Sequence, residues 1–184
     1  MDLVDLIKAT DFLGREFLVW LWFRSEKNEG LFTLEEHGTF ELYFDDQLSL
    51  SDGELGGEQH ILSGQEPART IEAKLALRRG KYPIKAKLRV VKDQKEWIFL
   101  LNGDHLRVHS AKLPALLTNE EDDQFHERIS LIEELESVIA GLYAQFVQQR
   151  VDAGKWEEVT SAIHAWLMPS DADRRRVASV ELPA

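Results

Sequence analysis

The chain has 184 residues, of which 43% are hydrophobic, and a formal net charge of −11, a composition that predicts one packed domain. It has no cysteine, which excludes a disulfide framework, a thiolate metal site and a cysteine nucleophile. The longest apolar run, Phe17–Phe23, has seven residues, whereas a membrane span needs about twenty, and the acidic start lacks the features of a signal peptide. We therefore expect a cytoplasmic protein without membrane contacts.

The N-terminal third of the sequence predicts a helix followed by strands. Residues Asp11–Ser25 form a helix that is apolar almost all round and therefore buried, with Met1–Ala9 as a separate short amphipathic turn. From Leu31 the hydrophobic period changes to two, and alternation over Phe40–Phe44 indicates a strand. Asp45-Asp46 is the expected turn of a hairpin that returns over Gln47–Leu50.

The middle of the chain predicts a short basic helix within a run of strands. A short strand is expected at Gln59–Leu62, and Glu66-Pro67 and Gly80 suit the start and end of the helix. In Ile84–Val90 apolar residues alternate with Lys85, Lys87 and Arg89, which indicates a half-buried strand with a basic outer face. Further strands are expected at Trp97–Leu101 and Leu106–Val108, joined by a turn at Asn102-Gly103.

The last third predicts two helices. The acidic run Glu120–Asp123 is a loop or a helix entry, and His126–Gln149 is a long helix with apolar residues every three or four positions. A second helix covers Trp156–Leu167, and residues 169–184 read as a disordered tail. The fold class is therefore α+β, a single domain over residues 1–168 in which an antiparallel sheet packs with a buried N-terminal helix, the short basic helix and two C-terminal helices.

The positive charge is concentrated in one segment. Between Arg69 and Lys95 there are ten basic and two acidic residues, so this segment carries +8 and the rest of the chain −19. Cations spaced about 7 Å apart along a strand can contact a nucleic-acid backbone without reading its sequence. A solvated face paired with the acidic remainder of the chain is the alternative. The candidate DNA-binding residues are Lys74, Arg78, Arg79, Lys81, Lys85, Lys87 and Arg89.

Other chemistries have weaker support in the sequence. Asp45, Asp46 and the triplet Glu72-Ala73-Lys74 loosely match the carboxylates and lysine of metal-dependent nucleases, but the triplet falls on a predicted helix rather than a strand. His105 and His109 lack a third ligand nearby, so no zinc site is expected. We expect no enzyme activity, catalytic residue, metal, cofactor or small-molecule substrate. A protein-interaction module that docks a partner through Phe17–Phe23 or the acidic run is a further hypothesis.

Three segments resemble the C-terminal half of the recombination-associated protein RdgC family. They are LGREFLVWLWFRSE from Leu13, IEAKLALRRGKYPIKAKLRV from Ile71 and EWIFLLNGDHLRVHSAKLP from Glu96, followed by the long helix from His126. The resemblance implies a nucleoid-associated, DNA-binding homodimer without base specificity, which modulates recombination or replication by occupying DNA through its phosphates. It also implies that the seven candidate cations face DNA. Members of that family form a ring-shaped dimer with a positively charged inner surface. We do not expect the ring here, because the resemblance covers only half of the family's length.

Overall fold

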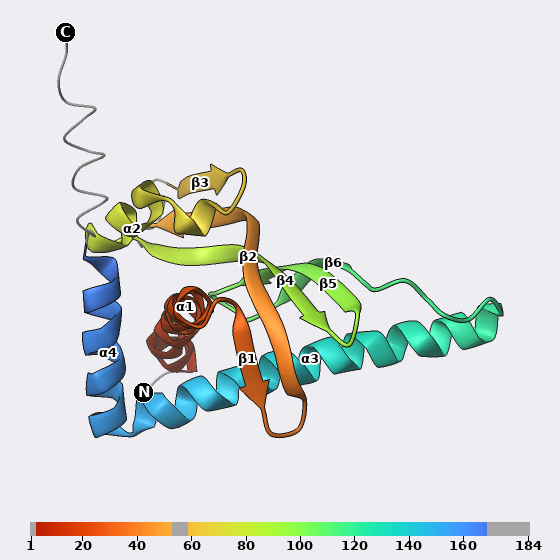
Figure 1. Cartoon of the computed structure of the whole chain (residues 1–184). Helices are drawn as coiled ribbons and strands as arrows, with labels where there is room; N and C mark the ends of the chain where they lie inside the picture. The colour runs from red at the N-terminus through yellow and green to blue at the C-terminus, as the bar shows by residue number, and fades with distance from the viewer. Residues whose placement is uncertain (1–2, 53–58, 169–184) are drawn as a thin grey trace, which may run out of the picture.

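The computed structural model describes the backbone of residues 3–52 and 59–168 and the side chains from Leu13 onward in these ranges. The predicted tail at 169–184 and most of the predicted loop after Ser51 therefore lie outside the described residues. Figure 1 shows the α+β fold expected from the sequence. Its elements are α1 (Leu3–Lys27), β1 (Leu31–Leu34), β2 (Gly38–Ser51), β3 (Gln59–Ser63), η1 (Pro67–Arg69), α2 (Ile71–Arg78), β4 (Tyr82–Lys92), β5 (Lys95–Asn102), β6 (Val108–Lys112), α3 (Glu121–Val151) and α4 (Ala153–Leu167).

The six strands form one antiparallel sheet in the order β1-β2-β4-β5-β6, with β3 paired to β2 off this path. Alternate residues of β4 and β5 point to opposite faces, as the period-two pattern requires. The inner face carries buried Ala86, Leu88 and Val90 from β4 and Trp97 and Phe99 from β5. The outer face carries Lys85, Lys87 and Arg89 of β4 beside the half-buried Ile98 and Leu100 of β5, so one face of the sheet is buried and the other is open to solvent.

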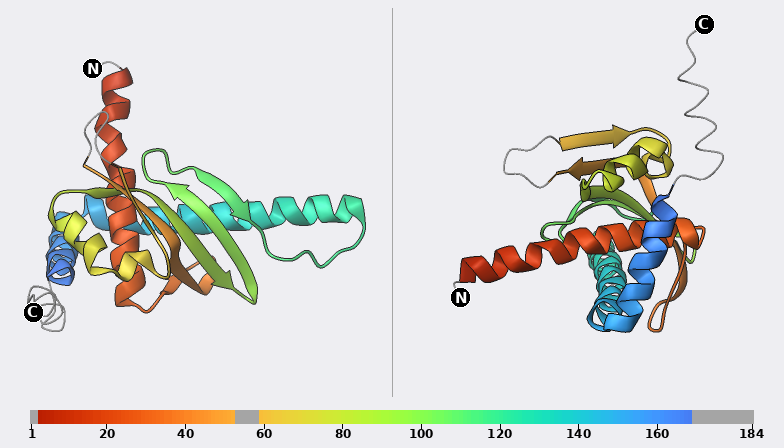
Figure 2. Two further views of the ribbon diagram at one scale, coloured as in Figure 1. Left: turned by 90° about the horizontal axis from the view of Figure 1, so that it is seen from above. Right: turned by 90° about the vertical axis from the view of Figure 1, so that its left-hand side faces the viewer.

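Helix α1 lies between the inner face of the sheet and the two C-terminal helices, and it crosses α3 in Figure 2. Phe17, Trp20 and Trp22 are completely buried, which confirms the buried N-terminal helix. The ring of Phe146 on α3 lies 5.6 Å from that of Phe17 and 5.9 Å from that of Trp20. The aromatic run therefore belongs to the core, and it cannot dock a partner without unfolding.

Helix α3 runs under the sheet and extends beyond it at its N-terminal half (Figures 1 and 2). Its core stripe is Leu131, Leu135, Val138, Leu142 and Phe146. The Trp97 indole Nε1–H donates to the Leu131 carbonyl oxygen over 3.1 Å, which ties β5 to the helix. The apolar period of three or four residues in the sequence also includes Ile129 and Ile132, but they are 38% and 43% exposed and lie on a second stripe.

Several element boundaries differ from the sequence prediction. Helix α1 is continuous from Leu3, so the separate turn at Met1–Ala9 is wrong. The hairpin turn at Asp45-Asp46 is also wrong, because β2 runs through both residues with a register shift between Phe44 and Leu48. The tight hairpin instead joins β1 to β2 before Gly38. In each case a local turn or polar signal is overridden by pairing and packing over a longer stretch.

Two further boundaries are corrected in the basic segment and after it. The single helix predicted from Pro67 splits into η1 and α2, because Thr70 is extended and its side-chain oxygen accepts the Ala73 N–H, a helix N-cap. Strand β6 covers Val108–Lys112 rather than Leu106–Val108. The acidic run from Glu120 is a helix entry, with Glu121, Asp122 and Asp123 in the first turn of α3, where negative charge is favourable.

The turn between β4 and β5 is fixed to α3 by Glu134. Its two carboxylate oxygens accept from Lys92 Nζ at 2.8 Å and Lys95 Nζ at 3.0 Å. Partial burial acts to raise the pKa of Glu134, but the hydrogen bonds from Lys92 and Lys95 outweigh it and hold the pKa below its usual 4.5. The native state therefore binds a proton here less readily than the unfolded state does.

Acid should remove the contribution of Glu134 to stability. The stabilisation is present above the unfolded-state pKa near 4.5 and is lost as the pH falls through the lower pKa of the folded state. We expect Glu134→Gln to be less stable than the parent at pH 7 and to lose less stability between pH 5 and pH 3. Urea unfolding followed by circular dichroism at each pH measures both quantities. Parallel pH profiles for parent and variant would contradict this assignment.

Candidate nucleic-acid interface

Strand β4 carries three of the predicted cations on the outer face of the sheet. Its buried residues Ala86, Leu88 and Val90 alternate with Lys85, Lys87 and Arg89. The alternation follows from the strand geometry, because the aliphatic neighbours must face the core. The basic outer strand face expected from the sequence is therefore present, with Lys85 exposed and the other two partly exposed.

A second basic row, which the sequence reasoning missed, lies on β6 and the turn before it. Leu100 on β5 pairs with Lys87 on one side and with His109 on the other. Residues directly opposite across a sheet share a face, so the side chain of His109 points outward with that of Lys87. In the same way Ile98 lies between Arg89 and Lys112.

The row extends into the turn between β5 and β6. Asn102 pairs with Lys85, and its backbone N–H donates to the Arg107 carbonyl oxygen over 2.9 Å, which places Arg107 opposite Asn102. The alternation of Arg107 and His109 around Val108 is visible in the sequence and could have indicated that both side chains lie on one face of a strand. The sequence could not predict that Lys112 shares this face, because the pairing register shifts between His109 and Lys112. We call the set Lys85, Lys87, Arg89, Arg107, His109 and Lys112 the basic face.

Two cations of the basic face already have acidic neighbours. Lys87 Nζ lies 2.9 Å from Asp46 Oδ1 and 3.6 Å from Asp45 Oδ2. The hydrogen bond to Asp46 raises the pKa of Lys87, against a smaller opposing effect of burial. Arg89 lies 3.7 Å from Glu96 and above the ring of Tyr43, at 5.4 Å from its centroid. These pairs are partly exposed, so each is worth at most about 1 kcal/mol and a phosphate can compete for the cation.

The other four residues of the basic face form no ion pair in the part of the chain that the structure describes. No carboxylate there lies within ion-pair distance of Lys85, Arg107, His109 or Lys112. Arg107, His109 and Lys112 are exposed, as is Lys85. Beside Leu100 and Ile98, the neighbours on β4 are the ion-paired Lys87 and Arg89, whereas those on β6 are His109 and Lys112, which form no ion pair among the described residues. Lys85 and Arg107 lie on either side of Asn102.

The remaining predicted site residues lie around the end of α2. Arg78 and Arg79 are exposed at the C-terminus of the helix, and Lys81 precedes β4 directly. Among the described residues none of the three has a carboxylate within ion-pair distance. Lys74 differs from them, because its Nζ lies 2.6 Å from Glu26 Oε2 and 4.9 Å from the centroid of the Trp166 ring. Its ammonium is thus engaged in joining helices.

The residues of the nuclease hypothesis do not assemble into a metal site. Asp45 and Asp46 contact Lys87 on the sheet, whereas Glu72 is exposed on α2 and Lys74 contacts Glu26. Over residues 3–52 and 59–168, side chains before Leu13 apart, no three His, Asp or Glu side chains are grouped to hold a metal ion. His105 and His109 join no such group there, and each stays a single exposed imidazole.

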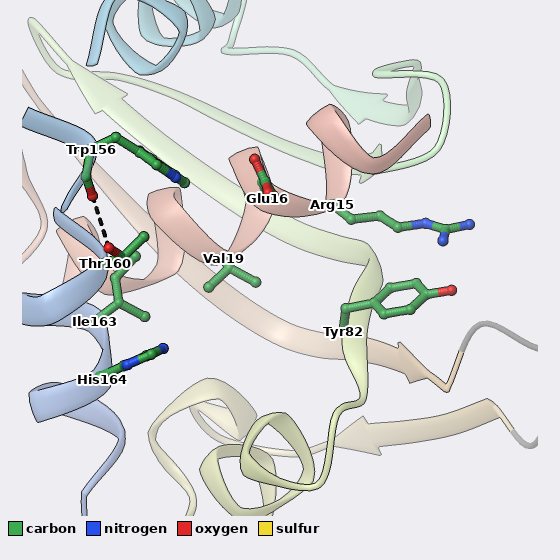
Figure 3. Close-up of a pocket in the computed structure, with 8 residues that line it drawn as sticks. All are labelled: Arg15, Glu16, Val19, Tyr82, Trp156, Thr160, Ile163 and His164. Carbon is green, nitrogen blue, oxygen red and sulfur yellow. Dashed lines mark hydrogen bonds between the residues drawn. The ribbon is translucent and has the colours of Figure 1, made fainter. Parts of the chain in front are cut away.

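An apolar groove of about 340 Å³ lies between α1 and α4 (Figure 3). Val19, Trp156 and Ile163 line it, with Tyr82 from the start of β4 at one end. The charged groups at its rim are held by neighbours: Arg15 lies 2.8 Å from Asp104, and Glu16 lies 2.7 Å from Arg150. The groove is lined mostly by carbon, and it is separate from the basic face.

No known family model matches the chain, and no curated protein matches it. The resemblance to the RdgC family therefore rests on the quoted residues alone. Along the described helices, no stretch combines the length and apolarity needed to cross a bilayer.

Proposed function

We propose that this chain binds nucleic acid through backbone phosphates on the basic face and the neighbouring end of α2. The observation that carries the proposal is a pair of basic rows, one on β4 and one on β6 and the turn before it, which the sheet register aligns on one outer face. Phosphate contacts of this kind supply affinity and orientation without reading bases. In this proposal the chain acts as an RdgC-type protein, which occupies DNA and so modulates recombination or replication.

The charge distribution supports this choice of surface. The protein carries −11 overall, so phosphate is repelled from most of its surface and accepted only where cations outnumber acids. Ile98 and Leu100, between the two rows, are aliphatic and do not offer the flat aromatic platform that stacks unpaired bases. Backbone contact is therefore the mode that this face fits.

The proposal predicts a steep, sequence-independent salt dependence. If about four cations contact phosphates, log K for duplex DNA should fall against log salt with a slope of about −3.6. Replacing both Arg107 and Lys112 with Glu removes the Arg and Lys of the second row, so the magnitude of the slope should fall by about 2 and the affinity by at least about tenfold. Fluorescence anisotropy of a labelled random duplex, and of one of its strands, measures both at two salt concentrations.

A matched control separates this surface from a general charge effect. Lys155→Glu makes the same type of change at an exposed position on α4, and it should leave affinity nearly unchanged. Circular dichroism melting checks that the Arg107→Glu/Lys112→Glu variant is folded. Equal losses in Lys155→Glu and in the double variant would overturn the proposed surface, and no binding at low salt would overturn the function.

A further inference from the structure

The N-terminal half of α3 exposes an apolar stripe that no described element covers. Phe125 is 61% exposed, Ile129 38% and Ile132 43%. This part of the helix projects past the sheet in Figure 1 and in the left view of Figure 2. The core stripe through Leu131 and Leu135 faces the sheet on a different side of the helix. The helix therefore has one apolar stripe for its own core and a second that faces solvent.

The exposed stripe has the spacing of a coiled-coil seam. Phe125, Ile129 and Ile132 are separated by four and then three residues, and the same alternation continues through Glu136, Ile139 and Tyr143. A seam of this spacing is typical of a helix that packs along a second helix, because alternate steps of three and four keep the residues on one side. Ile139 and Tyr143 are partly buried and pack against the core, so the exposed part of the seam ends near Ile132.

The residues that flank this seam would have complementary partners on a second copy of the same helix. With Ile129 at heptad position a, Glu121 and Arg128 fall at g, and His126 and Glu133 fall at e. In a parallel pair each g residue lies beside the e residue five positions later on the other helix. That rule places Arg128 beside Glu133 and Glu121 beside His126, and the twofold axis repeats both contacts.

We propose that the N-terminal half of α3, over Glu121–Glu133, pairs in parallel with the same segment of a second copy of this chain. In an antiparallel pair g residues lie beside g residues and e residues beside e residues, so Arg128 and Glu133 would no longer meet. The parallel register places the guanidinium of Arg128 beside the carboxylate of Glu133 on both sides of the seam, and this charge complementarity selects an identical helix as the partner. This inference is independent of nucleic-acid binding.

Glu136 sets the limit of the contact. It occupies the next a position, where two copies bring two carboxylates together. The dimer is therefore short and reversible, and its strength is adjustable by this one residue. Glu136→Leu replaces the repulsion with an apolar layer and should tighten dimerisation by at least about tenfold.

Sedimentation velocity of the full chain over a range of concentrations tests the interface. We expect a monomer–dimer equilibrium that Ile129→Glu shifts to monomer and Glu136→Leu shifts to dimer. Val151→Glu is the matched control, because Val151 is 76% exposed at the other end of α3 and lies outside the seam. A parent chain that stays monomeric at high concentration, with no dimer in Glu136→Leu, would overturn the proposal.

Two further readouts test the parallel orientation. The natural chain lacks cysteine, so Phe125→Cys and Ile132→Cys each introduce a single thiol. In a parallel pair each variant oxidises to a disulfide-linked dimer with itself, whereas an antiparallel pair cross-links only when the two variants are mixed. Arg128→Glu should weaken the dimer and Arg128→Glu/Glu133→Arg should restore it. Cross-linking only in the mixture, or no restoration in the double swap, would overturn the parallel register.

Discussion

Replacing Glu26 with alanine is expected to lower the free energy of unfolding by about 3 kcal/mol. The Glu26 carboxylate joins three helices: Oε1 accepts from Trp22 Nε1 at 2.9 Å, and Oε2 accepts from Lys74 Nζ at 2.6 Å and from Trp166 Nε1 at 2.8 Å. The Glu26 side chain is only 16% exposed. Its removal leaves a mostly buried ammonium and two indole N–H groups without their acceptor, and each unpaired group costs free energy.

Urea unfolding followed by tryptophan fluorescence measures this loss. Glu26→Gln keeps one acceptor oxygen and no charge, so it should lose less than the alanine variant. Glu158→Ala, an exposed position on α4, is the control and should change stability by less than about 0.5 kcal/mol. In Glu26→Ala/Lys74→Met the combined loss should be smaller than the sum of the single losses, because the orphaned ammonium is gone. Additive losses would mean that the two residues do not act together.

Gly14→Ala is expected to destabilise the protein by about 2 kcal/mol, although alanine in place of a mid-helix glycine usually stabilises by about 1 kcal/mol. The reason is close contact between α1 and the turn after β5. A methyl group at Gly14 would overlap the backbone carbonyl oxygen of Gly103, and a methyl at Gly103 would lie 2.7 Å from Leu18 Cδ1. Backbone cannot move aside as a flexible side chain can, so α1 has to shift away from the sheet.

Gly154→Ala is the matched control for this prediction. Gly154 is also in a helix, but its nearest neighbour to a new methyl would be Asp152 Oδ1 at 3.6 Å, an ordinary contact. We expect this variant to be as stable as the parent or more stable by up to about 1 kcal/mol. Thermal melting of the three proteins side by side gives the result. A Gly14→Ala protein that is stabilised like Gly154→Ala would show that α1 does not approach the turn this closely.

The elements that the sequence predicts best are those whose signal is long and periodic. The buried helix at Phe17–Phe23, the strand with alternating Lys85, Lys87 and Arg89, and the long helix from His126 all appear with the expected type. The hairpin at Asp45-Asp46 fails because two aspartates are also compatible with a strand whose bulge contacts Lys87. A short polar signal has too little information to overcome pairing across a whole strand.

Helix α3 shows a second reason why the sequence alone does not predict the tertiary structure. Its apolar residues are all visible in the sequence, but they form two stripes, one through Leu131 and one through Ile129. Which stripe faces the core depends on where the sheet and α1 lie, and that information is not in the helix itself. The same is true of Lys74, whose partner Glu26 is 48 residues away in the sequence.

The sequence by itself determines the α+β class, the buried aromatic helix and the concentration of cations between Arg69 and Lys95, because these depend on composition and local period. Only the tertiary structure decides which basic residues share a surface. The register of β4, β5 and β6 aligns Arg107, His109 and Lys112 with Lys85 and Lys87, while helix packing turns Lys74 toward Glu26. Register and helix packing are long-range pairings, and a local pattern predicts the faces of an element but not its neighbours.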